Sequence, residues 1–315
     1  MTVAVLVVGC GGGSSSGGGG DSGSSLEFGY DGVKQLSYAN TLLTWDELKS
    51  PTVKPHFFQQ SSLNLQALSG GNVQISQNAS AVTLPAIAKG ADLRIIGATV
   101  LHSWVLMASS DIKSIDDLKG KKLAAHSETS VSALFARQVC KEAGCDIVYI
   151  PGSPVRAQAI LSGQVAAATV FAADASRADI ENPGKTSVLK YFTDAPLPDL
   201  YVVTTKKWLD GHRDQATAVM RGLIDSAQRM KQDTQAAAES VQKQFPDEDP
   251  ALVSEVVKTY VEKGLWSQDG GLAMLKTVGD SVKFLKGVGS IPQSASDDPA
   301  DYVDTGPLEA AANGS

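Results

Sequence analysis

Two patterns of apolar and polar residues recur along the chain: short apolar runs, and longer segments in which apolar residues have helical spacing. From Val33 onward, an apolar run is typically followed by a serine, a helical segment and a glycine. This alternation of strand and helix is typical of α/β proteins with mostly parallel strands. The apolar runs predict strands at residues 53–59, 73–77, 93–100, 122–125, 147–150 and 165–171.

Serine, aspartate, proline and glycine mark the ends of the predicted helices. A serine or aspartate side chain at a helix start accepts a hydrogen bond from a free backbone N–H group, and glycine favours a helix end. These signals predict helices at 61–68, 80–89, 114–120, 153–162 and 249–263, and a further helix that begins within 127–130. Beyond Leu200 the chain is mainly helical, with one apolar face formed by Ala216, Val219, Met220, Leu223, Ala227 and Met230.

Composition is consistent with two lobes of ordinary size and excludes some partners. The chain has 315 residues, of which 43% are hydrophobic, so it can bury a large core. Its 34 acidic and 27 basic residues give a formal charge of −7, and no stretch is dense in lysine and arginine. We therefore expect no nucleic-acid partner. No apolar run is long enough to span a bilayer.

The N-terminal residues resemble a bacterial lipobox, in which a small residue precedes a cysteine that becomes lipidated. A short apolar run ends at Gly9 and Cys10, and nearly every residue from 11 to 25 is glycine or serine. We expect residues 1–10 to be a signal remnant lipidated at Cys10 and 11–30 to be a flexible tether. The predicted location is therefore extracytoplasmic, with the lipid as the sole membrane contact. A secretory signal begins with basic residues, and none precedes Val3. The alternative is that residues 3–8 form a buried first strand.

The other two cysteines, Cys140 and Cys145, are separated by four residues at an expected helix end. This spacing permits a local disulfide, which an oxidising compartment would favour. Two unpaired cysteines are the alternative. A single C-x4-C pair lacks the second pair of ligands that a metal site needs, so no metal is expected.

Four segments, in order along the chain, resemble the ABC-transporter substrate-binding proteins of the nitrate/sulfonate/taurine group. They are SIDDLKGKKLA at 114–124, LQALSGGNVQI at 65–75, AILSGQVAA at 159–167 and YVDTGPL at 302–308. The chain departs from the group where Gln74 and Ala166 replace acidic residues, and where FAA at 171–173 replaces a Trp-Glu-Pro motif. These departures leave the identity of the ligand open.

The resemblance implies a type II periplasmic-binding-protein fold, with two α/β lobes joined by a two-strand hinge and a ligand cleft between them. We expect the chain to cross between lobes near residues 105–109 and 197–203. Lobe 1 is then 31–105 and 202–292, lobe 2 is 106–201, and 293–315 is a surface tail.

Ligands of open parallel sheets collect at the carboxyl ends of the strands, where helix N-termini expose free N–H donors. Helix N-termini and neutral donors can hold an anion, so a carboxylate or sulfonate is plausible there. Arg137 and Arg156 are expected on solvated helix faces instead. Each serine, threonine or asparagine at these corners is alternatively a simple helix cap. The expected ligand-binding residues are Asn40, Thr41, Gln60, Ser61, Asn78, Ser80, His102, Trp104, His126, Ser127, Thr129, Ser130, Phe171 and Asp174.

The function implied by the resemblance is solute capture. A monomer would deliver a small polar or anionic organic molecule (a sulfonate, a carboxylate, a nitrate-like ion or a heterocycle) to an ABC permease and its ATPase by lobe closure. It would be no enzyme and would need no cofactor. The alternatives are an enzyme on the same fold, of the dehydratase or pyrimidine-precursor synthase type, and a sensory binding lipoprotein. His126 and Ser127 are adjacent in sequence, which is not the geometry of a catalytic dyad.

Overall fold

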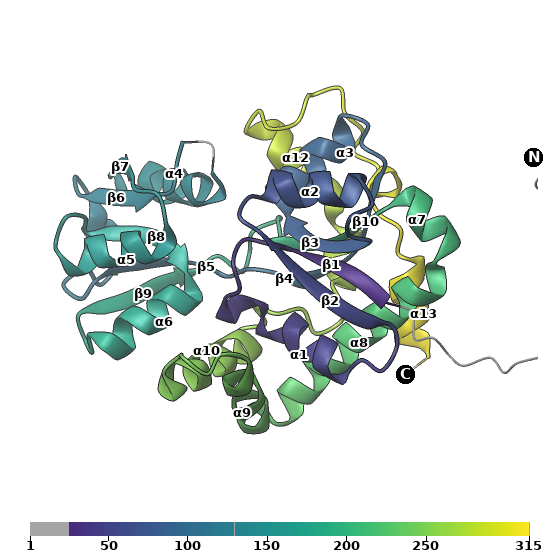
Figure 1. Ribbon diagram of the computed structural model, residues 1–315. Helices are drawn as coiled ribbons and strands as arrows, with labels where there is room; N and C mark the ends of the chain where they lie inside the picture. The colour runs from purple at the N-terminus through teal and green to yellow at the C-terminus, as the bar shows by residue number, and fades with distance from the viewer. Residues whose placement is uncertain (1–24, 129, 315) are drawn as a thin grey trace, which may run out of the picture.

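The computed structural model describes residues 25–128 and 130–314, which form two lobes, each built on a five-stranded sheet with helices packed around it (Figure 1). This arrangement confirms the predicted α/β class and the two-lobed type II fold. The expected lipidation site Cys10, residues 11–24 of the expected tether, and Thr129 lie outside the described residues.

The sheet of the first lobe has the strand order β2-β1-β3-β10-β4. Strand β1 pairs in parallel with β2 and β3, whereas β10 runs antiparallel to both β3 and β4. Four of the five strands therefore point the same way. Their bounds are β1 Ser25–Asp31, β2 Thr52–Phe58, β3 Ile75–Ala79, β4 Leu93–Val100 and β10 Leu200–Thr205.

Strand β1 corrects the expected boundary of the tether, because residues 25–30 belong to the folded lobe. Leu26, Phe28 and Tyr30 are almost completely buried, and β1 lies between β2 and β3. Leu26, Phe28 and Tyr30 lie on the same face of the strand, because side chains alternate between the two faces. Strand β1 directly follows the tract of glycine and serine, so the residue pattern gave no clear sign of where the strand begins.

The second sheet has the order β7-β6-β8-β5-β9. Strands β6, β7 and β8 are mutually parallel, and β5 runs antiparallel to β8 and β9. Its core is rich in alanine, such as Ala124, Ala125, Ala167 and Ala168, which are all fully buried. The bounds are β5 Trp104–Ser109, β6 Lys122–Ala125, β7 Asp146–Tyr149, β8 Ala167–Phe171 and β9 Thr186–Tyr191.

The chain passes between the sheets twice, at residues 101–103 and 192–199. The first crossing lies earlier than the expected 105–109, because Val105 to Ala108 pair with both β8 and β9 inside the second sheet. The second crossing partly overlaps the expected 197–203, of which residues 200–203 already belong to β10. Ser103 in one crossing donates from its backbone N–H to Asp199 Oδ2 in the other, at 2.7 Å.

Helices cover both sheets, and the long α8 supplies much of the first lobe's core. All six residues of its predicted apolar face are buried, which confirms that prediction. The first lobe also holds the short helices η1 Leu36–Tyr38, α7 Lys206–Gly211, α11 Leu272–Lys276 and η3 Pro299–Asp301. Its longer helices are α1 Ala39–Glu47, α2 Ser61–Ser69, α3 Ser80–Ala88, α8 Arg213–Gln232, α9 Thr234–Gln244, α10 Pro250–Glu262, α12 Val278–Gly287 and α13 Gly306–Asn313. The second lobe has η2 Asp116–Leu118, α4 Val131–Ala143, α5 Ser153–Leu161 and α6 Ala172–Glu181.

The C-terminal segment, expected as a surface tail, is part of the first lobe's packing. Tyr302 and Leu308 are buried, and the backbone N–H of Ile95 in β4 donates to the Tyr302 carbonyl at 2.9 Å. Helix α13 lies against α8. The alternation of Asp, Ala and Pro in this segment gave no sign of these contacts.

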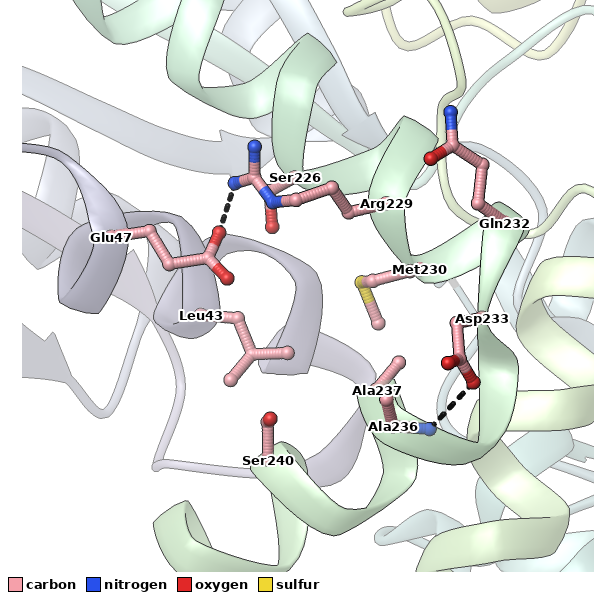
Figure 2. Close-up of a pocket in the computed structure, with 10 residues that line it drawn as sticks. All are labelled: Leu43, Glu47, Ser226, Arg229, Met230, Gln232, Asp233, Ala236, Ala237 and Ser240. Atoms are coloured by element: carbon pink, nitrogen blue, oxygen red, sulfur yellow. Dashed lines mark hydrogen bonds and ion pairs between the residues drawn. The ribbon is translucent and has the colours of Figure 1, made fainter.

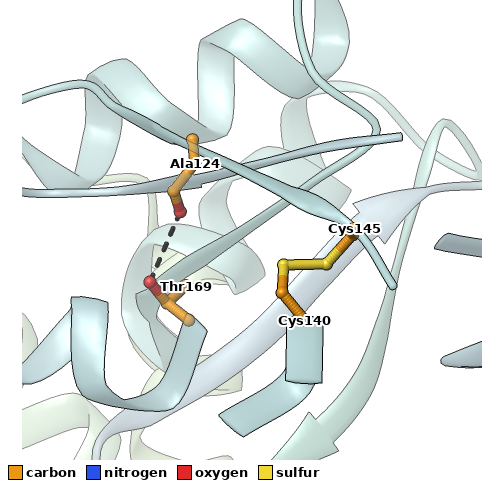
Figure 3. The surroundings of a disulfide bond; sticks show 4 residues. All are labelled: Ala124, Cys140, Cys145 and Thr169. Carbon is orange, nitrogen blue, oxygen red and sulfur yellow. Dashed lines mark hydrogen bonds between the residues drawn. A yellow bond between two sulfur atoms is a disulfide. The ribbon is translucent and has the colours of Figure 1, made fainter. Parts of the chain in front are cut away.

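A disulfide joins Cys140, near the end of α4, to Cys145, just before β7 (Figure 3). The bond therefore ties a helix to the edge strand of the second sheet through a short turn that contains Gly144. Across the described part of the chain, no helix is long and apolar enough to cross a membrane.

Candidate ligand-binding site

The strand directions bring the predicted corners of the two sheets to two edges that face each other. In the first lobe, the carboxyl ends of β1, β2, β3 and β4 share one edge, and β4 leads from that edge into the second lobe through residues 101–103. In the second lobe, the carboxyl ends of β6, β7 and β8 share an edge with the amino end of β5. Because Val100 and Trp104 are so close in sequence, the two edges must lie opposite each other.

On the first edge, Ser61 and Asn78 belong to one hydrogen-bonded group with Asp31, a residue that the sequence did not single out. Ser61 Oγ donates to Asp31 Oδ2 at 2.6 Å, the backbone N–H of Ala79 donates to the same oxygen at 3.1 Å, and Asn78 Nδ2 donates to the Ser61 carbonyl at 3.1 Å. Burial raises the pKa of the Asp31 carboxyl, and the hydrogen bonds from Ser61 and Ala79 oppose that rise. Asp31 is the last residue of β1, followed by Gly32 with a φ of 93°.

Other predicted residues of this lobe are held inside it. Thr41 is fully buried, donates to the Tyr38 carbonyl at 2.9 Å and accepts from the Tyr30 hydroxyl at 3.0 Å. Asn40 is buried and donates from Nδ2 to the Thr99 carbonyl at 3.3 Å. Ser80 is buried and its hydroxyl donates to the Pro198 carbonyl. Gln60 is exposed at the start of α2. These contacts favour structural roles for Thr41 and Ser80.

On the second edge, Trp104 and Phe171 are paired across β5 and β8. Their ring centroids are 4.2 Å apart with an interplanar angle of 39°. Both side chains are half-buried, so they form an aromatic surface at the end of the sheet. The Arg156 guanidinium carbon lies 6.0 Å from the Trp104 ring centroid.

Arg156 is buried rather than solvated, which corrects the expectation for this residue. Its side chain is 1% exposed, Nε donates to the Thr169 carbonyl at 2.8 Å, and Nη1 donates to the Ile150 carbonyl at 3.0 Å. No described residue accepts a hydrogen bond from Nη2. Burial lowers the pKa of Arg156 to about 10, and the charge of Asp174 opposes this change. Arg156 therefore remains a cation at neutral pH.

Asp174 and the two histidines complete this region. Burial raises the pKa of Asp174, and Ser153, Arg177 and Arg156 oppose the rise. Burial lowers the pKa of both His102 and His126, so both imidazoles are neutral at neutral pH. His126 is exposed, and its Nδ1 accepts a hydrogen bond from the Gly152 N–H at 3.1 Å.

Ser127 and Ser130 build the turn that opens α4. Ser130 Oγ donates to the Ser127 carbonyl at 2.7 Å and accepts from the Ala133 N–H at 3.3 Å. Ser130 is therefore the N-cap of the helix, as the cap signal in the sequence predicted. Thr129, the remaining predicted residue of this corner, lies outside the described residues.

Several ionisable groups lie in or near the crossings between the lobes, and burial shifts their pKa values. Asp199 lies in the second crossing, where burial raises the pKa of its carboxyl to about 7. Burial, followed by the charges of Asp199 and Asp174, raises the pKa of Tyr260 in α10. Burial, followed by the charge of Asp31, raises the pKa of Tyr38. Burial is thus the dominant cause of these shifts, and Asp199 and Tyr260 lie outside any recognisable sequence motif.

The lobes also touch outside the strand ends, where α6 packs against α10. Arg177 Nη2 in α6 lies 2.9 Å from each carboxylate oxygen of Glu248, which precedes α10.

A separate surface cavity of about 270 Å³ lies between α1, α8 and α9, with Leu43, Met230 and Ala237 on its walls and an Arg229–Glu47 ion pair beside it (Figure 2). This cavity is remote from the strand ends. In the segments 25–128 and 130–314, no group of three or more His, Cys, Asp or Glu side chains is arranged to hold a metal.

Comparisons with solved structures match this two-lobed arrangement. The periplasmic aliphatic sulphonate binding protein SsuA from Escherichia coli is 18% identical, with 90% of this chain and 92% of that chain covered and a TM-score of 0.68. The alkanesulfonate-binding protein SsuA from Xanthomonas axonopodis, bound to MOPS, is 17% identical, with 86% and 96% covered and a TM-score of 0.63. The periplasmic nitrate-binding protein NrtA from Synechocystis is 10% identical, with 93% and 89% covered and a TM-score of 0.65.

Comparisons of sequence give one clear match. No curated protein matches the chain significantly. The model of the family described as "NMT1/THI5 like" matches residues 55–237, which is more than half of the chain. The resemblance to the nitrate/sulfonate/taurine group is thereby confirmed at the level of family and fold: the chain belongs to the NMT1/THI5-like family and has the fold of the periplasmic binding proteins.

Proposed function

We propose that this protein is the extracytoplasmic solute-binding component of an ABC importer, and that it captures a small polar or anionic organic molecule between its two lobes. The observation that carries the proposal is the pair of facing strand-end edges, one with Asp31 and Ser61, the other with Trp104, Phe171 and Arg156. Ligands of open α/β sheets bind at such edges. The names of the solved relatives, which bind sulfonates and nitrate, support this class of function.

Arg156 provides the strongest chemical support for an anionic group on the ligand. Two backbone carbonyls fix its guanidinium, and Nη2 has no hydrogen-bond partner among the described residues. A guanidinium held in this way binds a carboxylate or sulfonate with little loss of side-chain entropy. The adjacent Trp104 and Phe171 rings offer an apolar surface for the carbon skeleton.

The remaining parts of the proposal follow from the sequence. Lipidation at Cys10 would keep the protein at the membrane surface, where the permease and ATPase act. The binding unit is proposed to work as a monomer, without a cofactor, and to return its ligand chemically unchanged. Release of an unmodified ligand distinguishes it from an enzyme on the same fold.

A thermal-shift screen tests the proposal. The panel contains organic sulfonates, carboxylates, nitrate, amino acids and pyrimidines, and a ligand at about 100 times its Kd should stabilise the protein by about 2.7 kcal/mol. Mass spectrometry of the recovered ligand should find it unchanged. The proposal is wrong if no compound raises the melting temperature, or if the recovered compound is converted.

A pair of tryptophan variants tests the location of the site. Trp104→Ala should weaken binding of the selected compound by roughly tenfold or more, because a large aromatic contact is removed. Trp208→Ala is the matched control, since Trp208 is also half-buried but lies in α7, away from the strand-end edge. Equal effects of the two substitutions would contradict the proposed position.

A further inference from the structure

The cavity between α1, α8 and α9, here called the three-helix cavity, is a space that the side chains of the first lobe do not fill (Figure 2). Leu43 and Met230, which belong to the hydrophobic core, lie on its walls, and Ala237 leaves it open because its side chain is small. Its volume is about 270 Å³. A cavity of about 150 Å³ already binds benzene. The three-helix cavity is therefore large enough for a small organic molecule.

Side-chain contacts hold the three helices around this cavity. Arg229 in α8 forms an ion pair with Glu47 in α1, as Figure 2 shows. Gln244 in α9 donates a hydrogen bond to Asp46, also in α1. Where α8 gives way to α9, the carboxylate of Asp233 accepts a hydrogen bond from a backbone N–H group at 2.9 Å and caps α9. Contacts between each pair of helices thus fix the shape of the cavity.

Two serine hydroxyls on the cavity walls have unused hydrogen-bonding capacity. Ser226 of α8 is only 2% exposed, yet its hydroxyl forms no hydrogen bond with any residue of the described chain. Ser240 of α9 also lines the cavity, is half-buried and forms no side-chain hydrogen bond within residues 25–128 and 130–314. A buried hydroxyl is normally hydrogen-bonded, because leaving it unpaired is unfavourable. The partner of Ser226 therefore comes from outside the chain.

The charges around the cavity favour an uncharged occupant. Glu47 and Arg229 neutralise each other, and Asp233 is exposed on the rim, where it caps α9. A charged group deeper inside would lose its hydration and meet only apolar walls and hydroxyls. Water could satisfy the hydroxyls, but it would also lie against the apolar walls. An organic molecule that displaces this water gains free energy from burial of its apolar surface.

We propose that the three-helix cavity is a second ligand-binding site, separate from the strand-end edges, for a small uncharged molecule with an apolar body and a hydroxyl or amide group. The apolar body contacts Leu43, Met230 and Ala237. The polar group bonds to the hydroxyl of Ser226, which can both donate and accept. All three helices belong to the first lobe, so this site does not depend on solute capture between the lobes.

Four compounds of similar size test the class of ligand: benzyl alcohol, toluene, benzoate and benzylammonium. Each is titrated into the full chain labelled with ¹³C at the methionine methyl groups. Met230 lines the cavity, whereas Met274 lies half-buried in α11, elsewhere in the same lobe. Benzyl alcohol should shift the Met230 methyl resonance in a saturable way and leave the Met274 resonance unchanged. It should bind roughly fivefold or more tightly than toluene, as expected for one added hydrogen bond.

Serine variants test the role of the Ser226 hydroxyl. Ser226→Ala should lower the affinity for benzyl alcohol to that for toluene and leave the affinity for toluene unchanged. Ser254→Ala is the matched control, because Ser254 is exposed on another helix, α10, and should keep the wild-type preference. The melting temperature of Ser226→Ala without ligand should be no lower than that of wild type, since the substitution removes an unpaired hydroxyl.

A variant that fills the cavity tests the position of the site. Ala237→Leu places additional side-chain atoms in the space that the ligand would occupy, so all four compounds should leave its Met230 resonance unchanged. An unaltered Met274 resonance confirms that this variant is folded. Continued binding of benzyl alcohol next to Met230 in Ala237→Leu would contradict the proposed position.

Three results with the wild type and Ser226→Ala would also overturn the assignment. If no compound gives a saturable shift of Met230, the cavity holds only water. If toluene or a charged compound binds as tightly as benzyl alcohol, the proposed ligand class is wrong. If Ser226→Ala binds benzyl alcohol as wild type does, the hydroxyl does not recognise the ligand. Each of these results leaves the proposed solute capture intact, because that proposal is tested at Trp104.

Discussion

Asp199 shows how burial of a single residue affects the hinge. Its carboxylate Oδ2 accepts hydrogen bonds from both the N–H and the hydroxyl of Ser103, so the two crossings are joined at this point. Burial nevertheless dominates and raises the pKa from an ordinary value of 3.8 to about 7. The protonated form of Asp199 is therefore favoured in the folded protein relative to the unfolded chain.

This shift predicts a pH dependence of the free energy of unfolding. Between about pH 4 and pH 7 the native state holds more protons at Asp199 than the unfolded state, so stability falls as pH rises, by up to about 1.4 kcal/mol per pH unit. The contribution is fully present below the unfolded pKa and is lost as pH rises through the folded pKa. Urea unfolding of wild type and Asp199→Asn over this range measures it as the difference between the two proteins.

The comparison with Asp199→Asn is needed because burial also raises the pKa values of Asp31 and Asp174, with the same sign of effect. Their contributions are shared by both proteins and cancel in the difference. Parallel stability curves for wild type and variant would show that the Asp199 pKa is not raised.

Predictions of helix caps from sequence were confirmed at some residues and wrong at others. Ser130 caps α4, and Asp249 accepts a hydrogen bond from the Ala251 N–H at the start of α10. The hydroxyls of Ser61 and Ser80 instead bond to Asp31 and to the Pro198 carbonyl, which lie on distant segments, so the expected caps were wrong there. Arg156 was misplaced because its partners, the Thr169 and Ile150 carbonyls, lie on other elements. Asp31 was missed for the same reason.

At the scale of elements, strands were predictable where the apolar run was distinct from its flanks. Strands β4 and β6 have the predicted bounds, whereas β9, with a lysine and a serine within it, was missed. Strand β5 was read as part of the hinge because its apolar run carries no sign of which sheet it joins. Its pairing with β8 and β9 is a long-range property.

The disulfide leads to a prediction at this scale, because it closes a short loop between α4 and β7. Loop-closure entropy for so few residues amounts to about 2 kcal/mol of stability. The double variant Cys140→Ser, Cys145→Ser should lose roughly this amount in urea unfolding. Adding a reductant to wild type should reproduce the loss and leave the variant unchanged. Equal stability of the oxidised wild type and the variant would contradict a stabilising bond.

At the scale of the whole molecule, two short crossings connect the lobes, and lateral contacts between the described residues, such as α6 against α10 and Lys263 against the Tyr191 ring, add to them. The Arg177–Glu248 pair among these contacts is partly exposed, so it contributes at most about 1 kcal/mol to holding the lobes together. Closure of the lobes must also work against the packing of α6 on α10, which involves more than this one pair. A ligand held by both edges would supply the additional free energy that favours a closed arrangement.

This energetic balance predicts that a saturating ligand from the screen reduces the radius of gyration in small-angle X-ray scattering. The reduction should come from the strand-end side, because α6 and α10 are already in contact on the other side. A non-binding compound at the same concentration should leave the scattering unchanged, and Trp104→Ala should need more ligand to reach the same contraction. A tight ligand that leaves the radius of gyration unchanged would rule out hinge closure, and the ligand would then bind to lobes that are already in their final arrangement.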